Sequence, residues 1–324
     1  MVKNIYKDKD IIVFGGCGSI GSELVKQLIE FKPKRIRVFD NRESGHFHLN
    51  QKLKSPLIRN LIGDIKDRDR VFRAMEKVDI CFNAAALKHV DLCEYNPFEA
   101  VNVNVIGTQN VLEASIDRDI KILIGISTDK AVSPICTMGA TKLLSEKIII
   151  NAPSGFSKIK LGVVRFGNVL NSDGSVIPIF KNQIANGGPI TITDMKMIRF
   201  CMTIDEAVKM ILKVPYIMDN REIFVLSNMK VMKIIDLAEV MIEDSNKNIK
   251  IVEKGIKPGE KLREILYTDE EIPYMVIKDN FFIIKNPIYS KPLTVREICN
   301  QENVELKLLT KSEIRELLYE NLIL

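Results

Sequence analysis

The chain has 324 residues, of which 46% are hydrophobic and 27% are charged, so it is not disordered and can form one large or two moderate domains. Its small net charge of +5 gives no argument for nucleic-acid binding, although it suits an anionic small ligand. No apolar run of about 20 residues, secretory signal, CxxC pair or zinc-ligand cluster occurs, so we expect a cytoplasmic protein without membrane insertion or metal.

The first half of the chain alternates short apolar runs with amphipathic stretches. The apolar runs predict buried strands at residues 10–14, 35–39, 60–62, 78–82, 121–126 and 159–166. The amphipathic stretches predict helices at residues 22–31, 71–77, 101–115 and 140–152. Strands that alternate with helices indicate βαβ units, and hence a parallel sheet with helices on both faces.

After about residue 168 this alternation weakens and prolines separate shorter elements. Helices are predicted at 176–186, 205–218 and 234–244, strands at 223–226, 249–252 and 281–284, and an amphipathic tail at 312–319. We therefore predict an α/β fold with a Rossmann-type doubly wound sheet. Its NAD(P)-binding domain covers residues 1–168, with a later segment returning to it, and a smaller α/β substrate lobe covers residues 169–324.

A glycine-rich turn follows the first predicted strand and opens the first helix. Its GxxGxxG motif consists of Gly15, Gly18 and Gly21. Such glycines permit a tight turn, close approach to a pyrophosphate and close packing of helix on sheet. The helix N-terminus, with Ser19 and Ile20, offers free N–H groups to the phosphates. Asp40 ends the second strand, as a dinucleotide-binding unit requires, so we predict bound NAD or NADP.

The side chains at the ends of the next strands bear on which cofactor binds. Asp40 can accept hydrogen bonds from ribose hydroxyls, which favours NAD, whereas Arg42 could meet the 2′-phosphate of NADP. Asp64, followed by Ile65, is placed for the adenine, although Asp64 could equally cap the following turn. Three small residues follow the fourth strand: Ala84, Ala85 and Ala86. Their small side chains allow either close approach of a cofactor or close packing within the protein.

The fifth strand ends at Thr128, and Asp129 and Lys130 follow it. Reacting groups in open α/β sheets gather at the carboxyl ends of the strands, so this Asp and Lys could form an acid–base pair. The same residues would also suit a surface turn. Met138 and Lys142 lie four residues apart and so share one face of the following helix.

These residues together resemble the extended short-chain dehydrogenase/reductase family. Within it, the chain is similar to the nucleotide-sugar 4,6-dehydratases that act on UDP-N-acetylglucosamine in polysaccharide biosynthesis. The resemblance extends from residue 11 to about residue 285 and is carried by segments 86–90, 94–97, 127–131, 138–142, 164–170, 191–194, 199–203 and 257–261.

The resemblance implies a redox cycle in which the cofactor is regenerated. Asp129, hydrogen-bonded through Thr128, would take the O4 proton during oxidation at C4 and later give a proton to the water that leaves C6. Lys130 would remove the C5 proton, provided that burial lowers its pKa. Lys142 would hold the nicotinamide ribose. Most members of the family have a tyrosine where Met138 stands, but a subgroup has Met there, as a packing residue beside the nicotinamide.

The resemblance also assigns the UDP half of the substrate to the C-terminal lobe. Arg199 and Lys257 are expected at the diphosphate, although the family usually has Arg at the second position. Glu260 is expected at the ribose or uracil. The remaining substrate-binding candidates are Lys88, Asn168 and Thr191. Each of these residues, taken alone, could equally be a surface charge or a turn former.

Two other functions share this fold. A UDP-sugar 4-epimerase needs no base at C5, so the Asp129–Lys130 pair argues against it. A non-catalytic sugar-nucleotide-binding protein would be compatible with the missing tyrosine. The resemblance further implies a homo-oligomer, either a dimer formed by a four-helix bundle of helices 101–115 and 140–152 or a hexamer. It leaves retention or inversion at C5 open.

Overall fold

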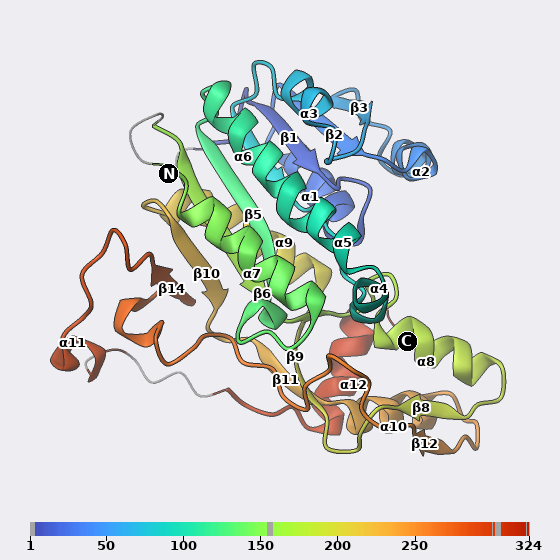
Figure 1. The fold of residues 1–324 in the computed structure, drawn as a ribbon. Coiled ribbons are helices and arrows are strands. Elements are labelled where there is room, and N and C mark those ends of the chain that lie inside the picture. The colour runs from blue at the N-terminus through green and yellow to red at the C-terminus, as the bar shows by residue number, and fades with distance from the viewer. Residues whose placement is uncertain (1–3, 154–157, 300, 302–305, 322, 324) are drawn as a thin grey trace.

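The computed structural model describes residues 4–153, 158–299, 301, 306–321 and 323. A sheet of nine strands runs through it in the order β13-β14-β10-β6-β5-β4-β1-β2-β3 (Figure 1). These strands are β1 (Asp10–Phe14), β2 (Arg35–Asp40), β3 (Ile58–Ile62), β4 (Ile80–Asn83), β5 (Ile122–Thr128), β6 (Lys160–Phe166), β10 (Glu222–Leu226), β13 (Met275–Lys278) and β14 (Phe281–Lys285). The part from β3 to β10 is parallel, and β14 joins its edge antiparallel.

The strand order reverses at β1, which lies between β2 on one side and β4 on the other. At such a switch point the connections leave in opposite directions, so the carboxyl ends of the strands are free to receive a ligand. All five residues of β1 are buried, as the continuous apolar run predicts for a strand with both faces covered. The predicted doubly wound α/β fold is confirmed.

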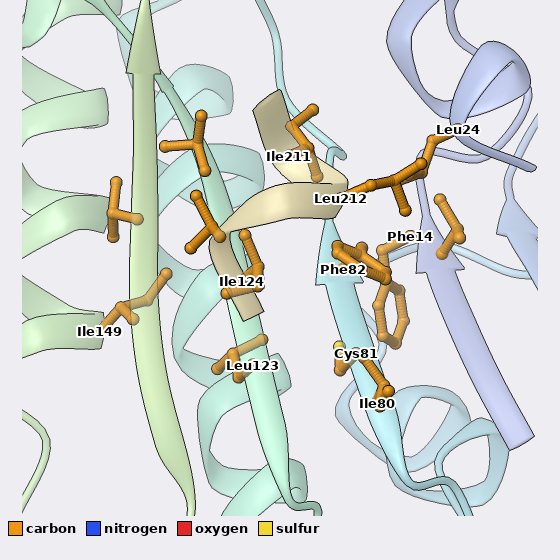
Figure 2. Packing of buried hydrophobic residues seen from close by; sticks show 14 of the residues in the cluster. Phe14, Leu24, Ile80, Cys81, Phe82, Leu123, Ile124, Ile149, Ile211 and Leu212 are labelled. Carbon is orange, nitrogen blue, oxygen red and sulfur yellow. The ribbon is translucent and has the colours of Figure 1, made fainter. Parts of the chain in front are cut away.

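Helices cover both faces of this sheet. On one face α1 (Ser19–Glu30) packs against α9 (Ile204–Ile217), and on the other lie α3 (Arg68–Ala74), α6 (Gly107–Asp117) and α7 (Thr137–Ile150). Figure 2 shows Ile211 and Leu212 of α9 close to Phe82 of β4, within one continuous hydrophobic core. The core therefore holds the strand ends in fixed positions relative to one another.

The C-terminal part of the chain builds a smaller lobe with its own hydrophobic core. Its sheets are formed by β7 (Asn168–Val169), β9 (Ile198–Met202) and β11 (Lys230–Lys233), and by β8 (Ile190–Ile192) and β12 (Ile251–Glu253). Its helices are α8 (Val176–Ala185), α10 (Ile234–Asp244) and α12 (Lys311–Glu320). Phe180, Leu237 and Ile314 are fully or almost fully buried between them. The predicted smaller lobe is thus present.

Residues beyond 168 contribute to both lobes. Helix α9 and strands β10, β13 and β14 belong to the large sheet and its cover, whereas the elements between them in sequence belong to the small lobe. The predicted boundary at residue 168 stays a prediction, because the chain passes between the lobes more than once.

The structure also contains elements that the sequence pattern did not predict. They are α2 (Glu43–Leu53), α4 (Val90–Tyr95), α5 (Pro97–Ala100), η2 (Asp129–Ala131), η3 (Ile272–Tyr274), α11 (Val295–Cys299) and strands β7, β8, β9, β11 and β13. Helix α2 buries only His46 and Leu49, so its sequence lacks the apolar periodicity from which a helix is predicted. The helix predicted at 101–115 begins with a π-helical segment, η1 (Val101–Ile106), and continues as α6.

Among the described residues, no helix has the length and apolar character that crossing a bilayer requires.

Candidate active site

The glycine-rich loop lies at the carboxyl end of β1. Gly15 has a φ of +68°, and a Cβ atom there would lie 2.7 Å from the backbone of Ala85. A Cβ on Gly21 would lie 2.1 Å from the carbonyl oxygen of Gly15. Both positions therefore require glycine. No side chain caps the N-terminus of α1, and its first turn has no acidic residue, so the N–H groups beyond Gly18 suit a phosphate. This environment fits a dinucleotide.

The carboxylate of Asp40 holds this loop in place. Its Oδ2 accepts a hydrogen bond from the backbone N–H of Cys17 at 3.0 Å, and its Oδ1 accepts from the backbone N and the Nε of Arg42 at 3.1 and 3.3 Å. Burial and the charge of Asp40 raise the pKa of the Cys17 thiol to about 12, so this cysteine is not a nucleophile. Arg42 is half-exposed, and its guanidinium can extend toward a ligand beside the loop.

The residues predicted near the adenine form a local turn. Oδ1 of Asp64 accepts from the backbone N–H of Lys66 at 2.9 Å, while the N-cap of α3 is Asp67. Asp64 therefore caps its own turn and not the helix. Ile65 is buried against Gly107, and Ala84 donates its backbone N–H to the carbonyl of Phe14. Contact of Asp64, Ile65, Ala84 and Ala86 with the cofactor stays a prediction.

Thr128, Asp129 and Lys130 form one hydrogen-bonded group at the carboxyl end of β5. Asp129 is completely buried, and its Oδ1 accepts from the hydroxyl of Thr128 and from Nζ of Lys130, each at 3.0 Å. The hydroxyl of Thr128 in turn caps the short helix η2. Oδ2 of Asp129 is also buried but has no hydrogen-bond partner among the described residues. A buried carboxylate oxygen without a partner is costly, unless a ligand supplies a donor.

A second carboxylate, which the sequence pattern does not indicate, lies at this group. Glu264, almost fully buried, places its Oε1 3.7 Å from Nζ of Lys130. Burial alone would lower the pKa of Lys130, but the charges of Asp129 and Glu264 outweigh burial and the repulsion of Arg199, so the pKa is raised. The expectation that burial lowers this pKa is therefore wrong. The only signal of Glu264 in the sequence is its position three residues after the matched segment 257–261.

Met138 and Lys142 lie on the first two turns of α7. Met138 is buried in a small apolar cluster with Cys93, Ala100 and Cys136. Its thioether has no exchangeable proton, so it packs. Lys142 donates from Nζ to the carbonyl of Ile126 on β5. Burial lowers the pKa of Lys142 to about 8, against the opposing effect of the Glu146 charge. A role of Lys142 at the nicotinamide ribose stays a prediction.

The start of α7 is fixed from two sides. A Cβ on Gly139 would lie 2.2 Å from the carbonyl oxygen of Lys130, so glycine is needed for α7 to contact η2 this closely. Asn104, in the π-helical segment η1, donates to the hydroxyl of Thr141 at 3.0 Å and bonds to both the backbone N–H and C=O of Leu87. The buried side-chain amide of Asn104 thus connects the loop after β4 with α7, the helix that carries Lys142.

Lys88 is tied to the glycine-rich loop through a segment of the small lobe. Its Nζ donates to the carbonyl of Asp173 at 2.6 Å, and the N–H of Asp173 donates to the hydroxyl of Ser19 at 3.1 Å. Burial lowers the pKa of Lys88. The 171–175 segment therefore contacts both the start of α1 and the loop after β4, between which a pyrophosphate would lie.

The remaining substrate candidates have different environments. Arg199 is buried, and its Nη1 donates to the carbonyls of Ile198 and Leu262. Thr191 accepts a hydrogen bond from Gln183 within the small lobe. Lys257 and Asn168 are exposed, and Oε2 of Glu260 is buried without a hydrogen-bond partner in the described chain. The Nη1 donor of Arg199 is therefore already bonded to backbone carbonyls. The roles of all these residues in substrate binding stay predictions.

The described residues contain no group of three or more His, Cys, Asp or Glu side chains that could hold a metal ion. The ionisable groups that do gather at the strand ends are the Asp129, Lys130 and Glu264 cluster, with Lys142 behind it. Such an arrangement suits proton transfer to and from a bound substrate.

Comparison with known proteins gives matches over nearly the whole chain. A family model described as polysaccharide biosynthesis protein matches residues 11–286. A protein of Methanocaldococcus jannaschii, described as an uncharacterized membrane protein, is 48% identical over 98% of this chain and 98% of its own length. The UDP-N-acetylglucosamine 4,6-dehydratase (inverting) of Campylobacter jejuni is 38% identical over 88% of this chain and 85% of its own. A UDP-glucose 4-epimerase of Rickettsia conorii is 37% identical over 83% and 80%.

Solved structures show the same fold. The X-ray structure of Pen from Bacillus thuringiensis has a TM-score of 0.89 and 42% identity, and the match covers 97% of this chain and 98% of that one. A dTDP-glucose 4,6-dehydratase from Streptomyces venezuelae, solved with NAD bound, has a TM-score of 0.73 at 19% identity, over 96% and 97% of the two chains. The second likeness concerns the fold alone.

Proposed function

The chain belongs to the polysaccharide biosynthesis protein family, and from this membership we propose that it is a UDP-N-acetylglucosamine 4,6-dehydratase. At the coarser level it is a nucleotide-sugar-modifying enzyme of the short-chain dehydrogenase/reductase type. The observation that carries the finer proposal is the buried Asp129 oxygen without a partner, next to the Lys130 ammonium at the end of β5.

NAD(P), when bound, would accept a hydride from C4 of the sugar and return it to C6. The residues that would hold it are those of the glycine-rich loop with Ser19, and Asp40 or Arg42 at the adenosine ribose. Related structures contain NAD. Whether the 2′-position carries a hydroxyl or a phosphate depends on Asp40 and Arg42.

Asp129 and Lys130 would move the protons of the reaction. Oδ2 of Asp129, which has no hydrogen bond within the described part of the chain, accepts the O4 proton as C4 is oxidised. The resulting ketone acidifies the C5 proton. Lys130 releases its ammonium proton to solvent once Asp129 is neutral, and as the amine it then removes the C5 proton. Asp129 then donates its proton to the C6 hydroxyl, and one water leaves. Lys130 finally returns a proton to C5 and takes up one proton from solvent, so both residues end as they began.

The raised pKa of Lys130 is compatible with this order of reaction steps, because the negative charge that mainly raises it is removed in the first step. Asp129 is the largest charge that holds the proton on Lys130. When Asp129 takes the O4 proton, that carboxylate becomes neutral and the pKa of Lys130 falls. The first step thereby favours the form of Lys130 that the second step needs.

Mass spectrometry of the product tests the proposal. The protein is incubated with UDP-N-acetylglucosamine and either NAD+ or NADP+, and the product should have lost one water. In D2O the product should carry deuterium at C5. Lys130→Ala should abolish this deuterium incorporation, whereas Lys181→Ala, which removes an exposed lysine of α8, should not. A substrate that stays unchanged in mass and structure, with the cofactor bound, would refute the proposal and indicate a binding protein.

A UDP-sugar 4-epimerase is the second candidate, because relatives with that name match over most of the chain. Epimerisation inverts C4 without removing the C5 proton. A product of unchanged mass, inverted at C4 and free of deuterium at C5, would favour it. The placement of Lys130 beside Asp129 gives the dehydratase the stronger support.

A further inference from the structure

Lys130 contacts two carboxylates, but the proposed reaction gives a task only to one of them. Oδ1 of Asp129 lies 3.0 Å from its Nζ, and Oε1 of Glu264 lies 3.7 Å away. The side chain of Glu264 is 3% exposed and that of Lys130 is 19% exposed. A glutamate this deeply buried is costly to keep charged, so its position calls for a reason.

The segment that carries Glu264 is firmly attached to the site. Lys261 donates from Nζ to the carbonyl of Val132 at 2.8 Å and lies 3.7 Å from Oε2 of Glu264. The carbonyl of Leu262 accepts from the N–H of Ile198 and from Arg199. These contacts place Glu264 from a segment distant in sequence, with Oε2 lacking any hydrogen bond in the described chain.

We propose that Glu264 is a positioning residue for Lys130, and that its carboxylate fixes the ammonium at a second point so that the nitrogen stays beside Asp129. The inference rests on the proposed function only for the reaction that Lys130 serves. Asp129 alone would leave the flexible lysine side chain held at one point, from which it can rotate. A second carboxylate removes that freedom before substrate arrives.

Four charged groups govern the protonation of Lys130. Asp129 and Glu264 favour its charged form, Arg199 on β9 opposes it, and Lys261 partly neutralises Glu264. Neutralising Glu264 removes one of the two charges that favour the ammonium of Lys130, while the repulsion of Arg199 remains. Lys130 should then lose its proton at a lower pH.

The first test measures Lys130 directly and needs no turnover. Holoprotein with NAD+ is treated with trace acetic anhydride between pH 6 and pH 11 in wild type, Glu264→Gln and Glu264→Asp, and acetylation of Lys130 is quantified by mass spectrometry. Because only the neutral amine reacts, Glu264→Gln should raise the labelling at pH 8 by about tenfold, a shift of roughly one pH unit. Glu264→Asp keeps the charge but lengthens the contact, so its profile should lie between those of wild type and Glu264→Gln. Glu270→Gln, at an exposed glutamate, is the matched control.

A Lys130 labelling profile that is the same in Glu264→Gln and wild type would overturn the inference. Should Glu264→Gln fail to fold, as judged by circular dichroism, Glu264→Asp decides. Its shorter side chain lengthens the 3.7 Å contact, so labelling should shift in the same direction by a smaller amount, and an unchanged profile would overturn the inference.

The second test follows C5 deuterium incorporation against pH in the same variants. The rising limb of kcat/KM should move to lower pH in Glu264→Gln, while the rate at the plateau falls because Lys130 is less well placed. A labelling shift without any turnover of UDP-N-acetylglucosamine in wild type would refute the proposed function and keep the positioning role. Turnover in wild type, with labelling and pH profiles that do not shift in Glu264→Gln, would support the proposed function and overturn the positioning role of Glu264.

Discussion

At the scale of single residues, the most informative atom is Oδ2 of Asp129. It is buried and has no hydrogen-bond partner among the residues that the structure describes, while Oδ1 of the same carboxylate accepts from two donors. We expect Asp129→Asn to lower kcat by about 10²–10⁴-fold, the usual range for loss of a general acid–base group. Binding of NAD+, measured by calorimetry, should be unchanged. Asp269→Asn, an exposed site, serves as control. Near-normal turnover in Asp129→Asn would show that another group takes the O4 proton.

The raised pKa of Lys130 makes a separate prediction about pH. The reactive form is the neutral amine, so kcat/KM, which reports the free enzyme, should rise with pH well into the alkaline range. In the bound 4-keto intermediate Asp129 carries the O4 proton and no longer holds the proton on Lys130, so the corresponding limb of kcat should lie at lower pH. Initial rates of C5 deuterium incorporation between pH 6 and pH 10 test this order. Coincident limbs would mean that Asp129 and Lys130 are not coupled.

We expect Arg42 to determine whether a 2′-phosphate is recognised. Its Nε is engaged by Asp40, and its side chain is half-exposed next to the loop. Arg42→Ala should weaken NADP+ binding by about tenfold, the low end for loss of a charge-assisted hydrogen bond, and leave NAD+ binding nearly unchanged. Calorimetric titration with both cofactors measures this ratio, with Arg59→Ala on β3 as an exposed control. Equal losses for both cofactors would mean that Arg42 acts only by supporting Asp40.

The residues found from sequence are those whose signal is local. The glycine-rich loop and Asp40 follow from the spacing of glycines and strand ends, and the structure indeed joins Asp40 to the loop. Glu264 has no such signal, because its partner Lys130 lies on a distant segment. The pKa of Lys130 was misjudged for the same reason. Burial can be guessed from an apolar neighbourhood, whereas two carboxylates converging from different segments cannot.

At the scale of elements, the sequence predicts those with a complete apolar pattern. The run at 10–14 became β1 without change, and the helix predicted at 205–218 became α9 within one residue at each end. Helix α2 was missed because only two of its residues are buried. The π-helical start of the predicted 101–115 helix was also missed, since it depends on Asn104 meeting Thr141 of α7 in three dimensions.

The position of the 171–175 segment should matter for the cofactor, because its Asp173 contacts both Lys88 and Ser19. Gly174 has a φ of +69°, and a Cβ there would lie 2.4 Å from the ring of His89. Gly174→Ala should therefore displace the segment from Lys88 and Ser19 at a cost of about 1–3 kcal/mol. We expect the Kd for NAD+ to rise by about tenfold. Gly187→Ala imposes similar backbone strain at a φ of +82° with no neighbour within 4 Å, so it controls for strain alone. Equal effects of both variants would contradict the assigned contact.

At the scale of the whole molecule, a buried network of two ion pairs, both made by Arg165, connects the parts that form the site. Arg165 of β6 bonds to both carboxylate oxygens of Glu146 on α7, to Glu271 and to the carbonyl of Leu266. The segment after Glu264 is thus tied to the helix that carries Lys142. Removing one partner of a buried ion pair usually lowers the free energy of unfolding by several kcal/mol. This network therefore fixes the position of α7 relative to the segment that follows Glu264.

The outer face of the helices at residues 97–117 and 137–150 carries exposed apolar side chains. Phe98, Ile106 and Leu144 are 75%, 46% and 50% exposed. Because the family resemblance implies a bundle of these helices from two subunits, we predict a dimer with this face buried. Light scattering after size exclusion should then give about twice the chain mass of 36.8 kDa.

The substitution Leu144→Glu tests which surface forms this dimer. In a twofold interface each change occurs twice, so two buried carboxylates would face the apolar contact and the dimer should dissociate at micromolar concentration. Ile288→Glu introduces the same charge at a residue that is 68% exposed and lies after β14, at the other edge of the sheet, and should leave the mass unchanged. A wild-type monomer would contradict the predicted dimer. A Leu144→Glu variant that stays dimeric would place the interface on another face of the molecule.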